Sequence, residues 1–519
     1  MENPSTINTK PCLVQTAQGF TVSYKNKFLY SKYNPSKSIL QIIENLTIQP
    51  QTIVLCVSPV LSYGLKELSD KLPDDCLMIG CELDSDLFDF IQQHQNNPEC
   101  DFSNIKNFSF ITKTELYNLG PQIIKQMGGK FRRIIRVDFS AAAQLNSNTY
   151  DKVVENVTNS LMTYWANRVT LVKFGRKYCT NFFKNLSVLD KTTPIQKYFG
   201  TFEKPILLFG AGESEQDGIE RIKKSAQNEY FILCADTALQ PLIANNIVPD
   251  GVFIEEAQNV IKKCFIGTQN SDIHIFAGLS SVHSITRLFK PEQISFFTTE
   301  FTTANFIDRF EKAGVLPPKN EPFGSVGITA WYYATLFRKD SSIPIYTYGL
   351  DFAYSAGRTH TKGTMADNAR FMTSSRIKTD ANYGAAFNEP AFKKDEKMYT
   401  TPIMERYAQI MRHCEQSVAI QKKDCRAPFE SLRDRDNDKV VAPGNILCQE
   451  AASLEELKSL LTGEKKLPAE ELEKEITRLI QDREYLYLHF PDGHKFQYSQ
   501  SFLNRVRVEV EYYLKIIER

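Results

Sequence analysis

Residues 204–214 read KPILLFGAGES, and this stretch decides the fold class of the chain. Ile206 to Phe209 form a short apolar run typical of a buried strand, and glycines and a serine follow it before a helix that begins near Asp217. Glycine lets a backbone approach a phosphate closely, and the positive end of a following helix favours the anion. The pattern predicts a nucleotide site at residues 210–214. A tight turn without a ligand is the alternative, because a short glycine motif is weak evidence by itself.

Strand and helix signals alternate on the C-terminal side of this stretch. Strands that alternate with helices form a parallel sheet with crossover connections. We therefore predict an α/β protein whose central part, residues 203–395, is a Rossmann-like, doubly wound domain. Its further strands are expected at Tyr230–Cys234, Gly251–Ile254, Ile273–Ala277, Gln293–Phe297 and Ile343–Tyr348.

A smaller N-terminal α/β domain is expected over residues 1–150. It would begin with a hairpin over Phe20–Asn34, turning at Lys25 to Lys27. Its parallel strands are expected at Thr52–Val57, Leu77–Cys81 and Arg133–Val137.

Helical periodicity predicts a linker over residues 151–202 and a helical C-terminal domain over residues 396–519. The mixed-charge run Arg433–Lys439 between two of these helices predicts a solvated loop. The C-terminal helices are expected at Met404–Lys422, Ser453–Leu461, Ala469–Arg483 and Ser501–Ile517.

Composition limits the partners of the chain. Its 519 residues include 62 basic and 61 acidic side chains, so no overall positive field would attract nucleic acid. The N-terminus lacks the basic and apolar regions of a signal peptide, and no run of about 18 apolar residues occurs, which predicts no membrane span. Eleven cysteines without a CxxC pair fit reduced thiols, so we expect a cytoplasmic protein.

Polar residues follow two of the predicted central strands. Asp236 and Thr237 come after the run FILCA, and Glu255 and Glu256 come after GVFI. Because ligands of open parallel sheets bind beyond the carboxyl ends of the strands, we expect these side chains to face a ligand crevice. Either acid could instead cap a helix.

Two later segments carry further candidate residues. Residues 321–329, EPFGSVGIT, form a second glycine and serine turn before a helix, and Gly324 and Ser325 there suit an anion or a ribose. The segment YTYGLDFAYSAGRTHTKGT, residues 346–364, places Asp351 just beyond a strand. Its polar loop then carries Arg358, His360 and Lys362, which could hold a diphosphate, and His360 could transfer a proton near neutral pH.

These segments, in this order, resemble the MptE-like family of the Maf motility accessory factors. The resemblance rests on KPILLFGAGES, FILCADTALQPLIANNIVPDGVFIEEAQ, GSVGITA and YGLDFAYSAGRTHTKGT, and it extends over roughly residues 50–400. That family includes flagellin glycosyltransferases and an enzyme that adds diphosphate to 6-hydroxymethylpterin. One position departs from the usual Gly-x-Gly-Pro-Ser loop, since Glu213 replaces the proline. A carboxylate there would repel a phosphate unless it pointed away.

The resemblance implies a glycosyltransferase that transfers a nonulosonic acid, such as pseudaminic, legionaminic or sialic acid, from CMP to Ser or Thr of flagellin. Under this hypothesis His360 or Asp351 transfers the proton, and no metal or other cofactor is required. The implied residues for nucleotide and donor are Gly210, Gly212, Ser214, Asp236, Thr237, Glu256, Gly324, Ser325 and Arg358.

Two alternatives remain open at this point. A diphosphokinase acting on a pterin-like alcohol would need Mg²⁺ between the ATP oxygens, with Asp236, Glu256 or Asp351 as ligands. A degenerate, non-enzymatic binding or assembly protein is the other alternative, and it would not bind nucleotides.

Overall fold

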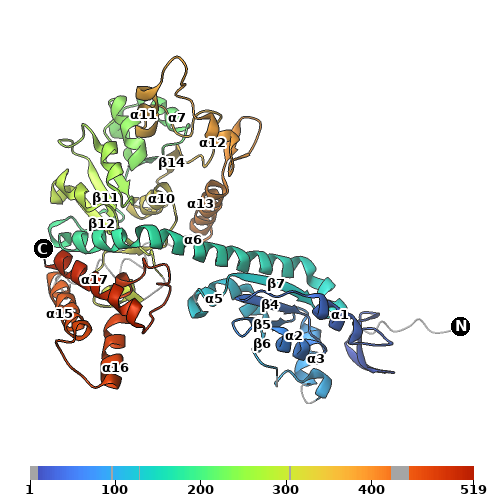
Figure 1. The fold of residues 1–519 in the computed structure, drawn as a ribbon. Coiled ribbons are helices and arrows are strands. Elements are labelled where there is room, and N and C mark those ends of the chain that lie inside the picture. The colour runs from blue at the N-terminus through green and yellow to red at the C-terminus, as the bar shows by residue number, and fades with distance from the viewer. Residues whose placement is uncertain are drawn as a thin grey trace. The chain divides into compact units, whose positions relative to one another are not determined.

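The computed structural model describes residues 10–94, 97–103, 105–127, 129–302, 305–421 and 443–518. The chain forms two compact units, Met1–Leu171 and Val172–Arg519 (Figure 1). Both units contain a parallel sheet covered by helices, which confirms the predicted α/β class. In the described parts of the chain, no helix is both long and apolar enough to cross a membrane.

The first unit contains a four-stranded parallel sheet of order β6-β5-β4-β7. Its central strand β4 is buried along its whole length, as expected from its continuous apolar sequence TIVLCV. The strands are β4 (Thr52–Val57), β5 (Leu77–Cys81), β6 (Phe108–Ile111) and β7 (Arg133–Asp138). The helices that accompany them are α1 (Lys37–Asn45), α2 (Leu65–Lys71), α3 (Ser85–Gln93), α4 (Lys113–Tyr117) and α5 (Leu119–Met127).

A small antiparallel sheet precedes this domain. Strands β1 (Cys12–Thr16), β2 (Gly19–Tyr24) and β3 (Lys27–Phe28) follow one another as a meander. Tyr24 pairs with Lys27, so the predicted turn consists of Lys25 and Asn26 alone. Both have positive φ, 47° and 59°, as a two-residue turn between right-twisted strands requires.

Helix α6 (Ser147–Leu186) overlaps residues 151–202, where a helical linker was expected, and its 40 residues begin in the first unit and end in the second. In the second unit, the buried Asn185 side chain fixes this helix to the loop after a central strand. Its Nδ2 donates to Leu279 O at 2.8 Å and to Ser281 O at 2.9 Å. Such buried amide bonds hold the helix in one register.

The second unit is built on a seven-stranded parallel sheet of order β13-β12-β11-β10-β9-β8-β14. The chain runs from β8 to one edge of the sheet and then returns to place β14 on the other side of β8. The carboxyl ends of β8 and β14 therefore form the topological switch point, where open sheets bind ligands. The strands are β8 (Ile206–Phe209), β9 (Phe231–Ala235), β10 (Gly251–Ile254), β11 (His274–Gly278), β12 (Ile294–Thr299), β13 (Lys319–Asn320) and β14 (Ile345–Tyr348).

Helix α10 (Val326–Phe337) carries the core of this unit. Ten of its 12 residues are buried, and it packs on β8, β9 and β10 through the aromatic cluster around Phe253, Phe276 and Tyr333. A helix that is apolar all round is expected in such a buried place. The other helices beside the sheet are α7 (Glu215–Lys224), α8 (Leu239–Ala244) and α9 (Asn305–Lys312).

A second small sheet and two short helices follow β14. The sheet has the order β15-β17-β16, with β15 (Tyr354–Ser355), β16 (Phe392–Lys393) and β17 (Met398–Thr400). Helices α11 (Met365–Thr373) and α12 (Tyr383–Phe387) lie between β15 and β16 in the chain.

The predicted C-terminal helices are present as α13 (Pro402–Gln421), α15 (Pro443–Thr462), α16 (Ala469–Ile480) and α17 (Gln500–Ile517). Helix α15 begins ten residues before the predicted start. A bidentate ion pair joins it to the sheet domain, because Arg309 in α9 donates to both carboxylate oxygens of the buried Glu450 at 2.7 and 2.8 Å. The charged run Arg433–Lys439 lies outside the described residues.

Candidate functional site

The glycine loop after β8 and the loop after β14 meet at the switch point. Gly210 N donates to Tyr348 O at 2.7 Å, and Gly212 N donates to Gly349 O at 2.8 Å. A Cβ atom at Gly212 would overlap the Asp351 carboxylate and lie 2.9 Å from Gly349 O. The glycines are therefore needed for the close approach of two backbone segments, whatever ligand binds beside them.

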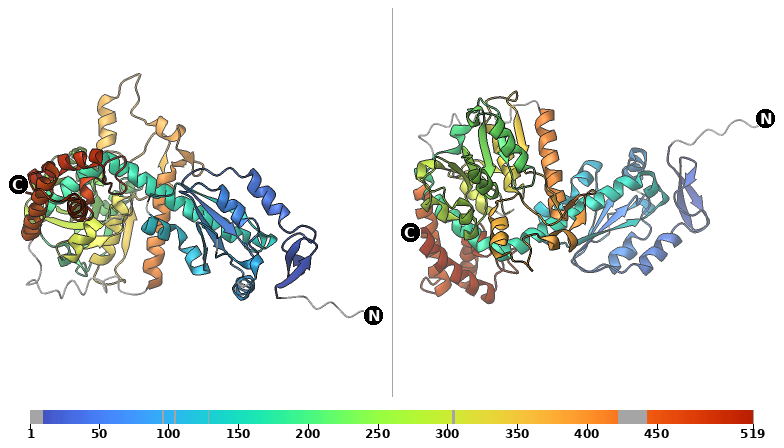
Figure 2. Two further views of the ribbon diagram at one scale, coloured as in Figure 1. Left: turned by 60° about the horizontal axis from the view of Figure 1, so that its bottom comes forward. Right: turned by 90° about the horizontal axis from the view of Figure 1, so that it is seen from above.

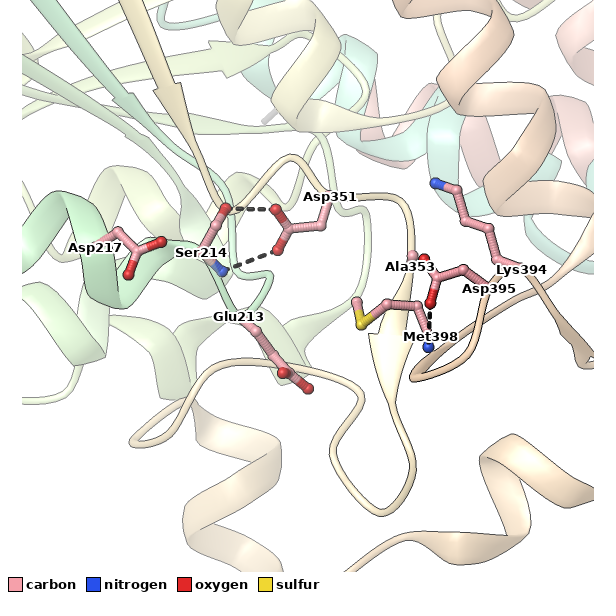
Figure 3. A pocket seen from close by; sticks show the side chains of 8 residues that line it. All are labelled: Glu213, Ser214, Asp217, Asp351, Ala353, Lys394, Asp395 and Met398. Atoms are coloured by element: carbon pink, nitrogen blue, oxygen red, sulfur yellow. Dashed lines mark hydrogen bonds between the residues drawn. The ribbon is translucent and has the colours of Figure 1, made fainter.

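Ser214 and Asp351 bond directly to each other across the two loops (Figure 3). Ser214 N donates to Asp351 Oδ2 at 3.0 Å, its hydroxyl donates to the other carboxylate oxygen, and Gly349 N donates to Ser214 Oγ at 2.7 Å. The amides of Gly212 and Ser214 are thus already satisfied within the protein. In the described residues, the amides of Ala211 and Glu213 donate to no other group.

Glu213, the residue at the usual proline position, also holds the loops together. Its carboxylate accepts hydrogen bonds from Ser355 N, at 3.0 Å, and from the Ser355 hydroxyl. Figure 3 shows that its side chain points away from the Asp351 carboxylate. Glutamate at this position therefore ties the glycine loop to β15, a contact that proline cannot make.

A pocket of about 380 Å³ opens beside this junction. Four carboxylates and one ammonium group line it, so it is formally negative and suits the hydroxyl groups of a sugar better than a bare phosphate. Its lining residues are Glu213, Ser214, Asp217, Asp351, Ala353, Lys394, Asp395 and Met398. The three from residues 394–398 were not predicted, because nothing in that charged stretch distinguishes it from a solvated loop.

The acids after β9 and β10 lie at the same edge of the sheet. Asp236 is buried, its Oδ1 accepts from Thr237 Oγ1 at 2.9 Å, and burial raises its pKa to about 7. Glu256 accepts from the amide of Gln258 at 2.8 Å. Glu255 reaches the helix side of the crevice, where Thr329 Oγ1 of α10 donates to it at 2.8 Å.

The second predicted turn, Gly324 and Ser325, begins helix α10. Gly324 has φ +77°, and a Cβ atom there would meet the ring of Tyr407 at 2.6 Å. The amides of Val326 and Gly327 at the positive end of this 12-residue helix have no acceptor in the described part of the chain, although Gly327 is buried. Gly327 packs against Leu350, which places this helix end beside the loop that carries Asp351.

The polar loop 356–364 closes onto the glycine loop through a hydrogen bond of 2.8 Å from Thr361 N to Ala211 O. His360, half-buried next to this contact, has its Nδ1 3.1 Å from Thr359 Oγ1. Burial, and then the charge of Arg370, lowers the pKa of His360 below its ordinary value, which favours the neutral imidazole. Arg358 is exposed, and neither it nor His360 lines the pocket.

Glu215 is a feature of the site that the sequence did not single out. It is the first residue of α7, it is fully buried, and neither of its carboxylate oxygens has a hydrogen-bond partner among the described residues. Burial and the nearby Asp351 raise its pKa to about 9, so it carries a proton at neutral pH. Of the predicted residues, Ser214 and Asp351 line the pocket, and the buried Glu215 follows Ser214 in the chain.

In the described residues, no three histidine, cysteine, aspartate or glutamate side chains are grouped as ligands of one metal ion. A Mg²⁺ ion that bridges nucleotide phosphates needs only one or two carboxylates, which Asp236, Glu256 or Asp351 could each supply.

The geometry defines a doubly wound α/β protein with a polar pocket at its topological switch point. Residues 180–357 match the family described as 6-hydroxymethylpterin diphosphokinase MptE-like. The chain is also similar to the structure of the Maf glycosyltransferase from Magnetospirillum magneticum AMB-1, with a TM-score of 0.53 and 12% sequence identity. That similarity covers 98% of this chain and 91% of the other.

An uncharacterized protein of Treponema pallidum (strain Nichols) is 29% identical over 557 aligned positions, which cover 98% of this chain and 95% of the relative. The resemblance stated from the sequence is therefore confirmed. Residues 180–357 are similar to the MptE-like family, and the fold of the chain is similar to that of a Maf glycosyltransferase.

Proposed function

We propose that this protein is a glycosyltransferase that moves a nonulosonic acid from a CMP-activated donor to serine or threonine hydroxyls of flagellin. The observation that carries the proposal is the Maf glycosyltransferase fold over 98% of the chain, together with the meeting of the predicted loops at its switch point. We propose the cytoplasm as its compartment, on the sequence argument above.

The chemistry of the site supports a sugar donor. The carboxylates of the pocket can accept hydrogen bonds from sugar or ribose hydroxyls, and Lys394 offers one positive charge. The amides at the start of α10, next to Gly324 and Ser325, would bind the phosphate of CMP or the carboxylate of the sugar. Thr237 and Glu256 would contact the nucleotide from the adjacent strand ends.

In the proposed reaction, the bond between the anomeric carbon of the sugar and the phosphate oxygen breaks, and its electron pair leaves with CMP. The acceptor hydroxyl oxygen forms the new bond to that carbon. Its proton passes to His360, whose pKa burial lowers. Asp351 contributes by holding Ser214, and with it the glycine loop, in place.

A second candidate is a diphosphokinase, favoured by the description of the matched family. It would use ATP with Mg²⁺ and a pterin-like alcohol. The non-enzymatic alternative predicts that no nucleotide binds.

Calorimetry and thermal-shift measurements distinguish these three hypotheses. The compounds to test are CMP, CMP-activated nonulosonic acids, UDP, and ATP with Mg²⁺. Binding of the CMP compounds without added metal is expected. Binding of ATP with Mg²⁺ alone would favour the kinase, and no binding by any of the compounds would favour the non-enzymatic protein.

A further inference from the structure

Lys394 is the only cationic residue among the described residues that line the pocket. It is exposed, and in the described part of the chain its ammonium group has no hydrogen-bond or ion-pair partner. A lysine ammonium group donates up to three hydrogen bonds and accepts none. The side chain therefore offers a positive charge that a ligand of this pocket can use.

Most carboxylates of the pocket are already bound within the protein. Glu213 and Asp351 accept the hydrogen bonds that hold the loops of the site together. Asp395 Oδ1 accepts from two backbone amides of the turn that follows it, both at 2.9 Å. Among the described lining residues, Asp217 is the one carboxylate without such a bond, and it can accept from a hydroxyl group. One cation and one acceptor are thus left for a ligand.

These two charged groups lie on different walls of the pocket (Figure 3). Asp217 belongs to α7, which follows the glycine loop, whereas Lys394 belongs to the hairpin that joins β16 to β17. Figure 3 shows Asp351 between them. An anionic group is repelled by the carboxylates and attracted by the ammonium group, so the hairpin wall is where it would bind.

The backbone pairing of the hairpin directs Lys394, and not its neighbour, to the pocket. Lys394 N donates to Met398 O at 2.9 Å, and Met398 also lines the pocket. Lys393 instead pairs with Tyr399, whose ring packs on Phe387 with 5.4 Å between the ring centroids. Successive side chains of a strand point to opposite faces. Lys393 is therefore an adjacent lysine that faces away from the pocket.

A CMP-activated nonulosonic acid carries two anionic groups, the phosphate of CMP and the carboxylate of the sugar. The phosphate is attached to the nucleotide, for which the glycine loop is the predicted site. The carboxylate is on the sugar, and nucleotide-activated neutral sugars lack it. An ammonium group beside a carboxylate forms a charge-assisted hydrogen bond, which is stronger than a bond between neutral groups.

We propose that Lys394 binds the carboxylate of the donor sugar and so selects acidic sugars over neutral ones. This inference rests on the proposed glycosyltransferase function, because the carboxylate belongs to the donor of that reaction. The phosphate of the nucleotide is the other anionic group that Lys394 could bind, and the experiment distinguishes the two.

The test measures the binding of three ligands to three proteins by calorimetry, with the full chain. The ligands are a CMP-activated nonulosonic acid (sialic, legionaminic or pseudaminic), its methyl ester at the sugar carboxylate, and CMP. The proteins are the wild type, Lys394→Gln and the matched control Lys393→Gln. Both lysines are exposed and have no hydrogen-bond or ion-pair partner among the described residues, so all three proteins should melt at the same temperature.

We expect the wild type to bind the acid about 10-fold more tightly than the ester, as is typical of a hydrogen bond between charged groups. Lys394→Gln should bind the acid about 10-fold more weakly than the wild type does, and it should bind the ester and CMP as the wild type does. Lys393→Gln should match the wild type with all three ligands.

Unchanged binding of the acid by Lys394→Gln would overturn this inference and leave the proposed function in place. An equal loss of affinity for the acid and the ester would also overturn it, and the same loss for CMP would assign Lys394 to the phosphate. An equal loss in both lysine variants would overturn it as well, because it would show an effect of overall charge. A wild type that binds none of the ligands would overturn the proposed function and this inference with it.

Discussion

Replacing Glu215 by glutamine should remove most of the pH dependence that this buried acid gives to the stability of the second unit. The side chain is fully buried, and its two oxygens have no hydrogen-bond partner among the described residues. The titratable groups that interact with it are Asp351 and the buried Cys234 of the neighbouring strand β9. None of these is a cation that would stabilise an ionised carboxylate.

The size of the effect follows from the pKa. Glu215 has a pKa of about 9 in the folded protein against an ordinary value of 4.5, so the folded state keeps a proton that the unfolded state loses. Its stabilising contribution is complete below pH 4.5 and is lost as the pH rises towards 9. Over the three pH units from 5 to 8, at ~1.4 kcal/mol per unit, the free energy of unfolding falls by up to about 4 kcal/mol.

Urea unfolding at pH 5, 6, 7 and 8 measures this slope for the wild type and for Glu215→Gln. Between pH 5 and pH 8 the free energy of unfolding of Glu215→Gln should fall by up to about 4 kcal/mol less than that of the wild type, because glutamine does not titrate. Glu220→Gln, on the same helix with a side chain that is 59% exposed, should keep the wild-type slope. Parallel curves for the wild type and Glu215→Gln would refute the reasoning, because they would show that Glu215 is not a buried neutral acid.

Three further substitutions test the candidate site. Gly212→Ala should destabilise the protein by about 1–3 kcal/mol and abolish CMP binding, because the new Cβ atom overlaps Asp351. The control Gly444→Ala should have neither effect, because no atom lies within 4 Å of a Cβ at that position. Equal melting temperatures of the two variants would contradict the packing argument. Asp351→Asn weakens the two hydrogen bonds that Ser214 donates to a charged carboxylate, and it should lower the free energy of unfolding by about 1.5–3 kcal/mol in urea titrations. An unchanged urea midpoint would contradict a stabilising contact between Ser214 and Asp351. His360→Ala should reduce kcat for transfer by ~100-fold with an unchanged Kd for CMP, and full turnover in this variant would remove His360 from the mechanism.

The sequence predicted most strands of both parallel sheets, and several of these, such as β4, β8 and β10, are continuous apolar runs buried along their whole length. It missed β6 (Phe108–Ile111), whose FSFI sequence is only half-buried, and β13 (Lys319–Asn320), two polar residues at the sheet edge. Pairing with the neighbouring strand forms such elements, and local sequence does not encode that pairing.

The candidate site, like the fold, could be predicted from the sequence only in part. The sequence placed Gly212 and Asp351 each just beyond the carboxyl end of a strand, but only the structure shows that these two strands are neighbours. The sequence could not show that the Gly212 amide donates to Gly349 O, which only the pairing of β8 with β14 determines. It also gave no sign of Glu215, since a glutamate in the first turn of a helix usually faces water and stabilises the helix dipole.

The most direct test of the proposed function is the reaction itself. The purified full-length chain is incubated with a CMP-activated nonulosonic acid and flagellin, and intact-protein mass spectrometry is combined with quantification of CMP. The account predicts that flagellin gains whole nonulosonic acid residues, one CMP is released for each, and His360→Ala slows both. Flagellin of unchanged mass, with ATP and Mg²⁺ instead consumed to form a pterin diphosphate, would contradict it.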